Sequence, residues 1–373
     1  MTAISHPPRV QTRAARPGEG VAIANLWHEL WYATEAWDGY PGSHDPRTYA
    51  NLAIRIDEHL SARAGRCICD KHIHLVADVG GVPCGQVEGQ IARLGTDPAT
   101  PITCQVQSLI VTESARGLGL GRVLLDALAE QARSVSGATP CVLSADVLER
   151  NPAIAFYKRL GFMTVGYCAR IHASEGASQN ARSSRDAVAR FAVAQDAISV
   201  TCLDLSVATR LLAEGDLRFD GPSKTIDLLQ ELARMTDSNG RTFEPSRSRE
   251  TPRLGPLAAH VSCSSNGSPP NPVTLVSVDR HGTVLGAALC ANQDLDLPFL
   301  PGRRAGVGRF AITPGCNAAS VVASLIALAC RLARDHGAKY LELADLSIPG
   351  SELHDAGLAA GATPWSRVVT KLA

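Results

Sequence analysis

Residues 115–124, ARGLGLGRVL, have the residue types and spacing in this sequence that most directly suggest chemistry. Gly117, Gly119 and Gly121 precede an apolar run, and Arg116 and Arg122 flank them. Glycine lets a backbone come within hydrogen-bonding distance of a ligand. The first N–H groups of a helix lack partners and attract negative charge. The stretch therefore predicts a loop that binds an anion, typically a phosphate, at the start of a helix.

Two known phosphate-binding loops fit this spacing poorly. The mononucleotide loop ends in Gly-Lys-Ser/Thr, and this stretch has no such lysine. The dinucleotide fingerprint, G-x-G-x-x-G, follows a strand directly, whereas the five residues TESAR separate Val111 from Gly117 here. Asp146 lies at a suitable distance downstream for a ribose contact, so the dinucleotide loop stays open as the weaker alternative.

A resemblance to a known family supplies a third interpretation. The stretch LIVTESARGLGLGRVLLDAL resembles the acetyl-CoA signature of the GNAT acetyltransferase superfamily, Arg/Gln-x-x-Gly-x-Gly/Ala, at Arg116, Gly119 and Gly121. The stretch NPAIAFYKRLGF resembles a later motif of that family, which starts at Asn151 and includes Tyr157. The resemblance implies that the loop holds the pyrophosphate of coenzyme A.

Acetyl-CoA is the co-substrate that the resemblance implies, and the resemblance covers roughly residues 8–172. The strand before the loop would pair with the pantetheine arm through the backbone of Leu109, Ile110 and Val111. Asn151 matches a position that often contacts the pantetheine or thioester end. The amides that would hold the pyrophosphate belong to Arg116, Gly117, Leu118, Gly119, Leu120, Gly121 and Arg122.

Acetyl transfer to an amine needs a base for the ammonium and a proton donor for the leaving thiolate. Tyr157 matches the tyrosine proposed as the general acid in many family members, and the alternative is a helix tyrosine that packs on the sheet. Three carboxylates are candidates for the general base. The candidates, in order of preference, are Asp146, Glu88 and Glu149, and each could instead be a solvated or structural charge.

The acceptor amine is expected to meet the first two helices and the loop between them. Aromatic and acidic residues alternate there, which suits an amine with an apolar body. Trp27 and Trp31 are four residues apart and are expected to face the core. Trp37, Asp38 and Tyr40 are therefore the candidate substrate-binding residues.

The stretch CICDKHIH is a weak candidate for a metal site. Cys67, Cys69, His72 and His74 are zinc ligand types. Cysteines one residue apart on a strand are closer than zinc knuckles usually require. We expect strand residues on both sides of a turn, and no metal in the protein.

The pattern of apolar residues predicts the elements that position these groups. Strand-like runs flank a Gly-Gly pair at 80–81, as in a hairpin. The expected helices cover 21–37, 45–63, 121–133 and 151–162, and the expected strands cover 72–81, 82–94, 102–111, 140–147 and 163–171. This order predicts an α/β fold with a mixed sheet.

The C-terminal part repeats this order and predicts a second GNAT-like copy. We divide the chain into a GNAT acetyltransferase domain at 1–172, a linker at 173–190, and a degenerate GNAT-like domain at 191–373 with a loop insertion near 238–272. An ungapped alignment places Asn317, Ser320 and Val322 at Arg116, Gly119 and Gly121, and Gly357 at Tyr157. Because these replacements remove the glycines and the phenol, the second copy is predicted not to catalyse.

The composition sets limits on partners and location. Lys plus Arg and Asp plus Glu both number 36, so bulk charge gives no support for nucleic acid or membrane partners. No apolar run is long enough to span a membrane, no secretory signal is expected, and the 11 cysteines are read as reduced thiols. We therefore expect a cytoplasmic protein, either a monomer with an internal pseudo-dimer or a homodimer.

Together these observations predict an acetyl-CoA-dependent N-acetyltransferase. A small-molecule amine would attack directly in a ternary complex in the N-terminal copy. The alternatives are a non-catalytic acyl-CoA-binding sensor, a transferase of another acyl group, and transfer to a protein amine.

Overall fold

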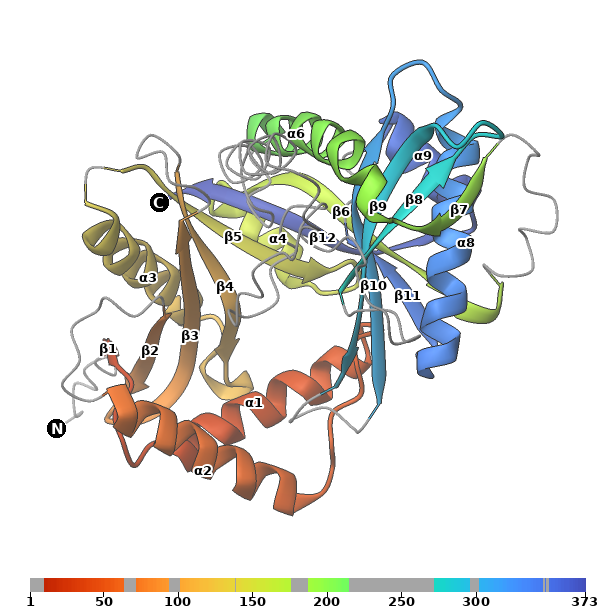
Figure 1. Ribbon diagram of the computed structural model, residues 1–373. Coiled ribbons are helices and arrows are strands. Elements are labelled where there is room, and N and C mark those ends of the chain that lie inside the picture. The colour runs from red at the N-terminus through yellow and green to blue at the C-terminus, as the bar shows by residue number, and fades with distance from the viewer. Residues whose placement is uncertain are drawn as a thin grey trace, which may run out of the picture.

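Two α/β copies share one sheet (Figure 1). The computed structural model describes residues 10–63, 72–93, 101–137, 139–175, 187–214, 272–295, 302–344, 346 and 349–373. The first copy, residues 10–172, contains β1 (Val10–Ala14), α1 (Gly20–Glu35), α2 (Pro46–Arg63), β2 (His72–Val79), β3 (Val82–Arg93), β4 (Ile102–Val111), α3 (Leu120–Ser136), β5 (Cys141–Leu148), α4 (Ala153–Arg159) and β6 (Met163–His172). The second copy, residues 187–373, contains β7 (Val188–Phe191), α6 (Ala197–Glu214), β8 (Val273–Val278), β9 (Val284–Asp294), β10 (Arg303–Ile312), α8 (Ala318–His336), β11 (Tyr340–Leu343), α9 (Glu352–Ala359) and β12 (Thr363–Leu372).

The predicted mixed α/β sheet and its order of elements are confirmed. The turn between β2 and β3 uses Gly80 and Gly81, both with positive φ, as a tight hairpin requires. Strand β1 was not predicted, because a short strand at the sheet edge carries little apolar period. The predicted linker is wrong at its end, where residues from Val188 onward form β7. The predicted insertion at 238–272 lies outside the described residues, apart from its last residue.

Within the described residues, twelve strands form one sheet in the order β1-β2-β3-β4-β5-β12-β6-β11-β10-β9-β8-β7. The last strand of the chain, β12, lies between β5 and β6, and Val368 stands opposite both Asp146 and Gly166. Strand β6 of the first copy pairs in turn with β11 of the second. The copies thus exchange their closing strands, so each completes the sheet of the other.

The two faces of this sheet carry different helices. Apolar side chains of β2–β5 pack on α3, and those of β8–β11 pack on α8. The alternate residues of β8–β10 pack on α6. Helices α1 and α2 lie over the other face of β2, where Ile23, Leu60 and Val76 form a small core. The face that carries α1, α2 and α6 is named the acceptor face, after the position predicted for the acceptor amine.

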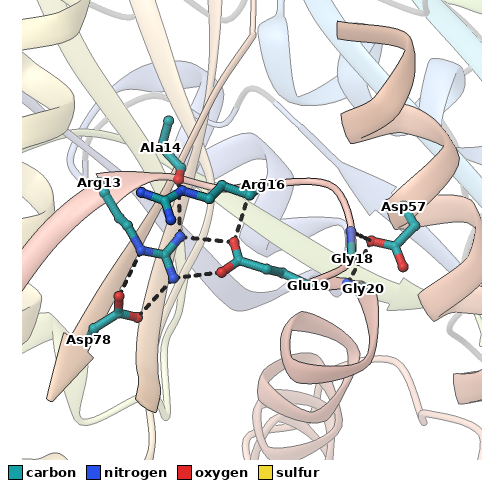
Figure 2. A network of polar contacts seen from close by, with 8 residues as sticks. All are labelled: Arg13, Ala14, Arg16, Gly18, Glu19, Gly20, Asp57 and Asp78. Carbon is teal, nitrogen blue, oxygen red and sulfur yellow. Dashed lines mark hydrogen bonds and ion pairs between the residues drawn. The ribbon is translucent and has the colours of Figure 1, made fainter. Parts of the chain in front are cut away.

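A polar network fixes α1 and α2 to the edge of the sheet (Figure 2). The Arg13 guanidinium donates to Asp78 at 2.7 Å and to Glu19 at 2.5 Å. Burial opposes ionisation of Glu19, but these hydrogen bonds prevail and lower its pKa. Asp57 of α2 accepts the Gly20 N–H at 2.8 Å. These contacts link α1 to the edge strands and to α2.

Candidate active site

The loop between β4 and α3 is shaped by two left-handed glycines. A short 3-10 turn at Glu113–Ala115 follows the strand, and Gly117 (φ +85°) and Gly119 (φ +80°) then lead into α3. Gly119 is the N-cap of the helix and supplies no side chain to its amides. Because L-residues with a side chain rarely adopt these angles, glycine is required at both positions.

Backbone amides of this loop are open to a ligand. Among the described residues, the N–H groups of Gly117, Gly119, Leu120 and Gly121 have no recorded hydrogen-bond partner, whereas the Arg122 N–H bonds the Gly119 carbonyl at 3.1 Å. A Cβ added at Gly117 or Gly119 would meet no atom within 4 Å. The site thus has donors, the positive end of a helix dipole and space for an anion.

Gly121 serves a different purpose from the other two glycines. A Cβ there would lie 3.1 Å from the Phe156 ring on α4. The third glycine of the motif therefore allows α3 and α4 to pack closely, in addition to offering its amide.

The strands beside the loop diverge where a ligand would lie. The parallel pairing of β4 with β5 joins Ile102–Val106 to residues 141–145 and is not recorded beyond them in the described part of the chain. Strand β4 continues to pair with β3, with a bulge at Gln107. The edge of Leu109–Val111 that faces β5 therefore has no recorded strand partner in the described part of the chain.

Tyr157 and Asn151 hold α4 in place. Tyr157 is buried between the rings of Phe156 and Phe162, with centroids at 5.5 and 5.1 Å. Burial raises the pKa of its phenol, so the hydroxyl stays protonated, as a proton donor must be. The Asn151 Oδ1 accepts the Ala153 N–H at 2.8 Å. These contacts show structural roles for both residues and leave the predicted chemical roles as proposals.

Two of the candidate bases lie on the acceptor face of the sheet. Glu88 on β3 is ion-paired with His72 at 2.8 Å. Burial opposes its ionisation, but the hydrogen bond and charge of His72 lower its pKa overall. Asp146 on β5 is exposed and accepts a weak contact from the Cys168 thiol at 3.9 Å.

The third candidate base, Glu149, forms an ion pair with the second copy. Its carboxylate is held by the Arg367 guanidinium of β12 at 2.5 and 2.9 Å. This pair joins the first copy to the exchanged strand.

Two of the predicted substrate-binding residues in the α1–α2 loop, Asp38 and Tyr40, contact the second copy. The Asp38 carbonyl accepts from Arg170 and from Trp365, each at 2.9 Å. The Tyr40 hydroxyl donates to Glu342 on β11. Trp37 is half-buried at the end of α1. The loop therefore forms a joint between the copies at the edge of the acceptor face, which sequence patterns within one copy could not reveal.

The tryptophans of α1 and the histidines of the candidate metal stretch make contacts within the fold. Trp27 and Trp31 stack at 4.8 Å, and Trp31 is buried as expected. His74 hydrogen-bonds Gln86 at 2.8 Å. Cys67 and Cys69 lie outside the described residues, and within those residues no group of three or more His, Cys, Asp or Glu side chains could hold a metal.

The second copy has a shorter strand-to-helix loop, and the ungapped alignment is wrong there. The loop covers residues 313–317, whereas its counterpart covers 112–119. The N-cap Asn317 therefore corresponds to Gly119, and its side chain accepts the Ser320 N–H at 3.2 Å. Val322 is a core residue of α8 rather than a loop residue.

The predicted placement of Gly357 at the position of Tyr157 agrees with the structure. Gly161 and Gly361 follow α4 and α9 with the same left-handed φ. Gly357 therefore stands where Tyr157 stands in the first copy. A Cβ at Gly357 would lie 2.6 Å from the Leu346 side chain, which occupies this place.

In the second copy, a buried ion pair lies between β10 and α6. Arg309 has φ +54° at a bulge in β10, and its guanidinium bonds Asp204 of α6. Both side chains are fully buried. The corresponding region of the first copy carries Ser108 and Ile110, so this charge pair is particular to the second copy.

Comparison with known proteins agrees with this geometry. Residues 28–162 match the model of the acetyltransferase (GNAT) family, and no curated protein matches the sequence. The structure is similar to the GCN5-related glucosamine N-acetyltransferase region of a fungal multi-domain GH3 β-N-acetylglucosaminidase (TM-score 0.53, 13% identity) over 98% of this chain and 38% of that one. This chain therefore spans well under half of that protein's length.

A second similar structure extends over both copies. It is a GCN5-related N-acetyltransferase from Sphaerobacter thermophilus (TM-score 0.51, 14% identity), with 99% of this chain and 97% of that one covered. In the part of the chain that the structure describes, no helix is long and apolar enough to cross a membrane. Residues 28–162 are thus similar to the acetyltransferase (GNAT) family, and the chain has a fold of two GNAT-like domains.

Proposed function

We propose that the protein is an acetyl-CoA-dependent N-acetyltransferase whose first copy acetylates a small-molecule amine. The observation that carries this proposal is the pair of exposed glycines, Gly117 and Gly119, whose amides have no recorded partner among the described residues, next to a strand edge that has lost its neighbour. An anion-binding helix start and an adjacent free strand edge suit the pyrophosphate and the amide-containing arm of coenzyme A. The family match of this region supports the same substrate.

Binding would use backbone groups more than side chains. Of the predicted amides from Arg116 to Arg122, those of Gly117 and Gly119 would face the diphosphate, and Arg116 and Arg122 add exposed positive charge. The strand edge of Leu109–Val111 aligns the thioester arm. Holding the thioester in line with the amine supplies much of the rate enhancement by positioning alone.

Asp146 is our choice for the general base. It lies on the acceptor face at the point where β4 and β5 separate. Glu88 is the weaker candidate, because its lowered pKa makes its carboxylate a poorer proton acceptor. Tyr157 would donate a proton to the leaving thiolate from the opposite side of the sheet. The amine would attack directly, without a covalent acyl-enzyme.

The second copy is proposed to be non-catalytic. Asn317 satisfies an amide that would have to be open for a phosphate, and Leu346 occupies the place of the phenol. The Arg309–Asp204 pair fills its acceptor side. The described cysteines are free thiols, which supports a cytoplasmic location.

An acetyltransferase assay on a panel of amines tests this proposal, with release of the CoA thiol as the readout. We expect Gly119→Ala to weaken acetyl-CoA binding by about tenfold or more, because the loop loses its left-handed turn. Gly81→Ala is the matched control, since Gly81 also has positive φ and open space but lies in the β2–β3 turn. Equal effects of both substitutions would refute the role of the loop.

Tyr157→Phe separates an enzyme from the alternative of an acyl-CoA sensor. An enzyme that uses the phenol keeps acetyl-CoA affinity and loses turnover. Acetyl-CoA binding without transfer to any amine in the wild type would favour the sensor.

A further inference from the structure

The acceptor face holds a cluster of charged side chains at the joint between the copies. Glu342 of β11 is 3% exposed. Its carboxylate accepts from Arg170 at 2.9 Å, from Arg304 at 2.8 Å and from the Tyr40 hydroxyl. One carboxylate thus serves two guanidinium groups, so neither arginine has a carboxylate of its own in the part of the chain that the structure describes.

The two arginines of this cluster are held differently. Arg170 uses Nε and Nη2 on Glu342 and Nη1 on the Asp38 carbonyl, and it stacks on the Trp365 ring at 3.4 Å. Arg304 uses only Nε, and its Nη groups have no recorded partner among the described residues. Its side chain is 46% exposed. Arg304 therefore presents a fixed guanidinium edge outward, the geometry that recognises carboxylates and phosphates.

Arg304 faces the region of the proposed base. Asp146, Cys168, Arg170 and Glu342 alternate onto the same face of adjoining strands. Burial lowers the pKa of Arg304, but nearby negative charges, including that of Asp146, raise it overall. The pairing of Gly306 with Glu342 puts Arg304 on this face as well, so Asp146 and Arg304 share one face of the sheet although they belong to different copies.

We propose that Arg304 of the second copy binds an anionic group on the acceptor of the first copy. The acceptor is then an amine that also carries a carboxylate or a phosphate-like group, with the ammonium near Asp146 and the anion on Arg304. This inference rests on the proposed function for the identity of the acceptor site. It gives the second copy a part in substrate selection without catalysis.

Calorimetric titration of the full chain, with and without CoA, tests the proposal. The probes are γ-aminobutyrate and ε-aminocaproate, each paired with the alkylamine of the same length, and an aminoalkylphosphonate. The wild type should bind at least one acid about tenfold or more tightly than its matched amine, as expected for a charge-assisted bidentate contact. Comparison of carboxylate with phosphonate identifies which anion is preferred.

Arg304→Gln should remove this preference, and Arg303→Gln should keep it. Arg303 is the adjacent control, with a similar exposure of 47% and its own partner in Asp294. Arg304→Gln should fold, because Glu342 retains Arg170 and Tyr40, and Arg304→Lys should restore only part of the preference. The same preference in Arg304→Gln, or none for any acid in the wild type, would overturn the proposal.

Failure of the proposed acetyltransferase function would give a different set of results. Acid binding that depends on Arg304, in a protein that neither binds acetyl-CoA nor transfers an acetyl group, would leave the anion site standing and refute the transferase.

Discussion

Replacement of Glu342 by Gln should destabilise the protein severely. The Glu342 side chain is 4% exposed and that of Arg170 is 11% exposed, so the substitution leaves a buried guanidinium without a carboxylate. Removal of one partner of a buried ion pair typically costs about 3–5 kcal/mol. Tyr40 and Arg304 lose a charged acceptor as well. Because Tyr40 belongs to the α1–α2 loop, the loss should also loosen the joint between the copies.

Urea unfolding of the full chain measures this cost. With an m-value of about 3 kcal/mol/M, a loss of 3–5 kcal/mol moves the unfolding midpoint by about 1 M or more. Asp294→Asn is the control, because its pair with Arg303 is largely exposed and should contribute less than about 1 kcal/mol. A Glu342→Gln midpoint no lower than that of Asp294→Asn would refute the reasoning that this carboxylate neutralises a buried cluster.

Three further predictions concern the frame of the site. The lowered pKa of Glu19 stabilises the fold above its unfolded value of about 4.5, and this contribution is lost as the pH falls through the lowered value. By urea unfolding, Glu19→Gln should thus cost roughly 1 kcal/mol at pH 7, allowing for solvent screening, and less at pH 3; equal costs would contradict this. Gly121→Val should cost about 1–3 kcal/mol by overpacking on Phe156, and Gly121→Val with Phe156→Ala should recover part of it; no recovery would argue against this contact. A chain ending at residue 172 should fail to give a sharp unfolding transition, because it lacks β12 between β5 and β6; a cooperative transition would show that the first copy folds alone.

Local patterns predicted the elements of the site and missed how the two copies meet. Helix and strand periods, the glycine pair at 80–81 and the loop before α3 are encoded by neighbouring residues. The exchange of β6 and β12 depends on pairings between distant strands that have similar alternating patterns, and no local signal distinguishes them. The contact of Tyr40 with Glu342 has the same origin.

Loop length explains the error in aligning the copies. The ungapped comparison placed Val322 at Gly121, because the sequence shows no mark where residues are missing from the second loop. Only the position of the helix start shows that Asn317 takes the place of Gly119. Signals for an N-cap were nevertheless present, since Asn followed by a run of helix formers is typical of one.

The stoichiometry of acetyl-CoA binding tests the central claim most directly. Calorimetric titration of the wild type should give one site per chain, which Gly119→Ala weakens and Gly81→Ala preserves. Two sites per chain, or one site unaffected by Gly119→Ala, would contradict a single active loop in the first copy.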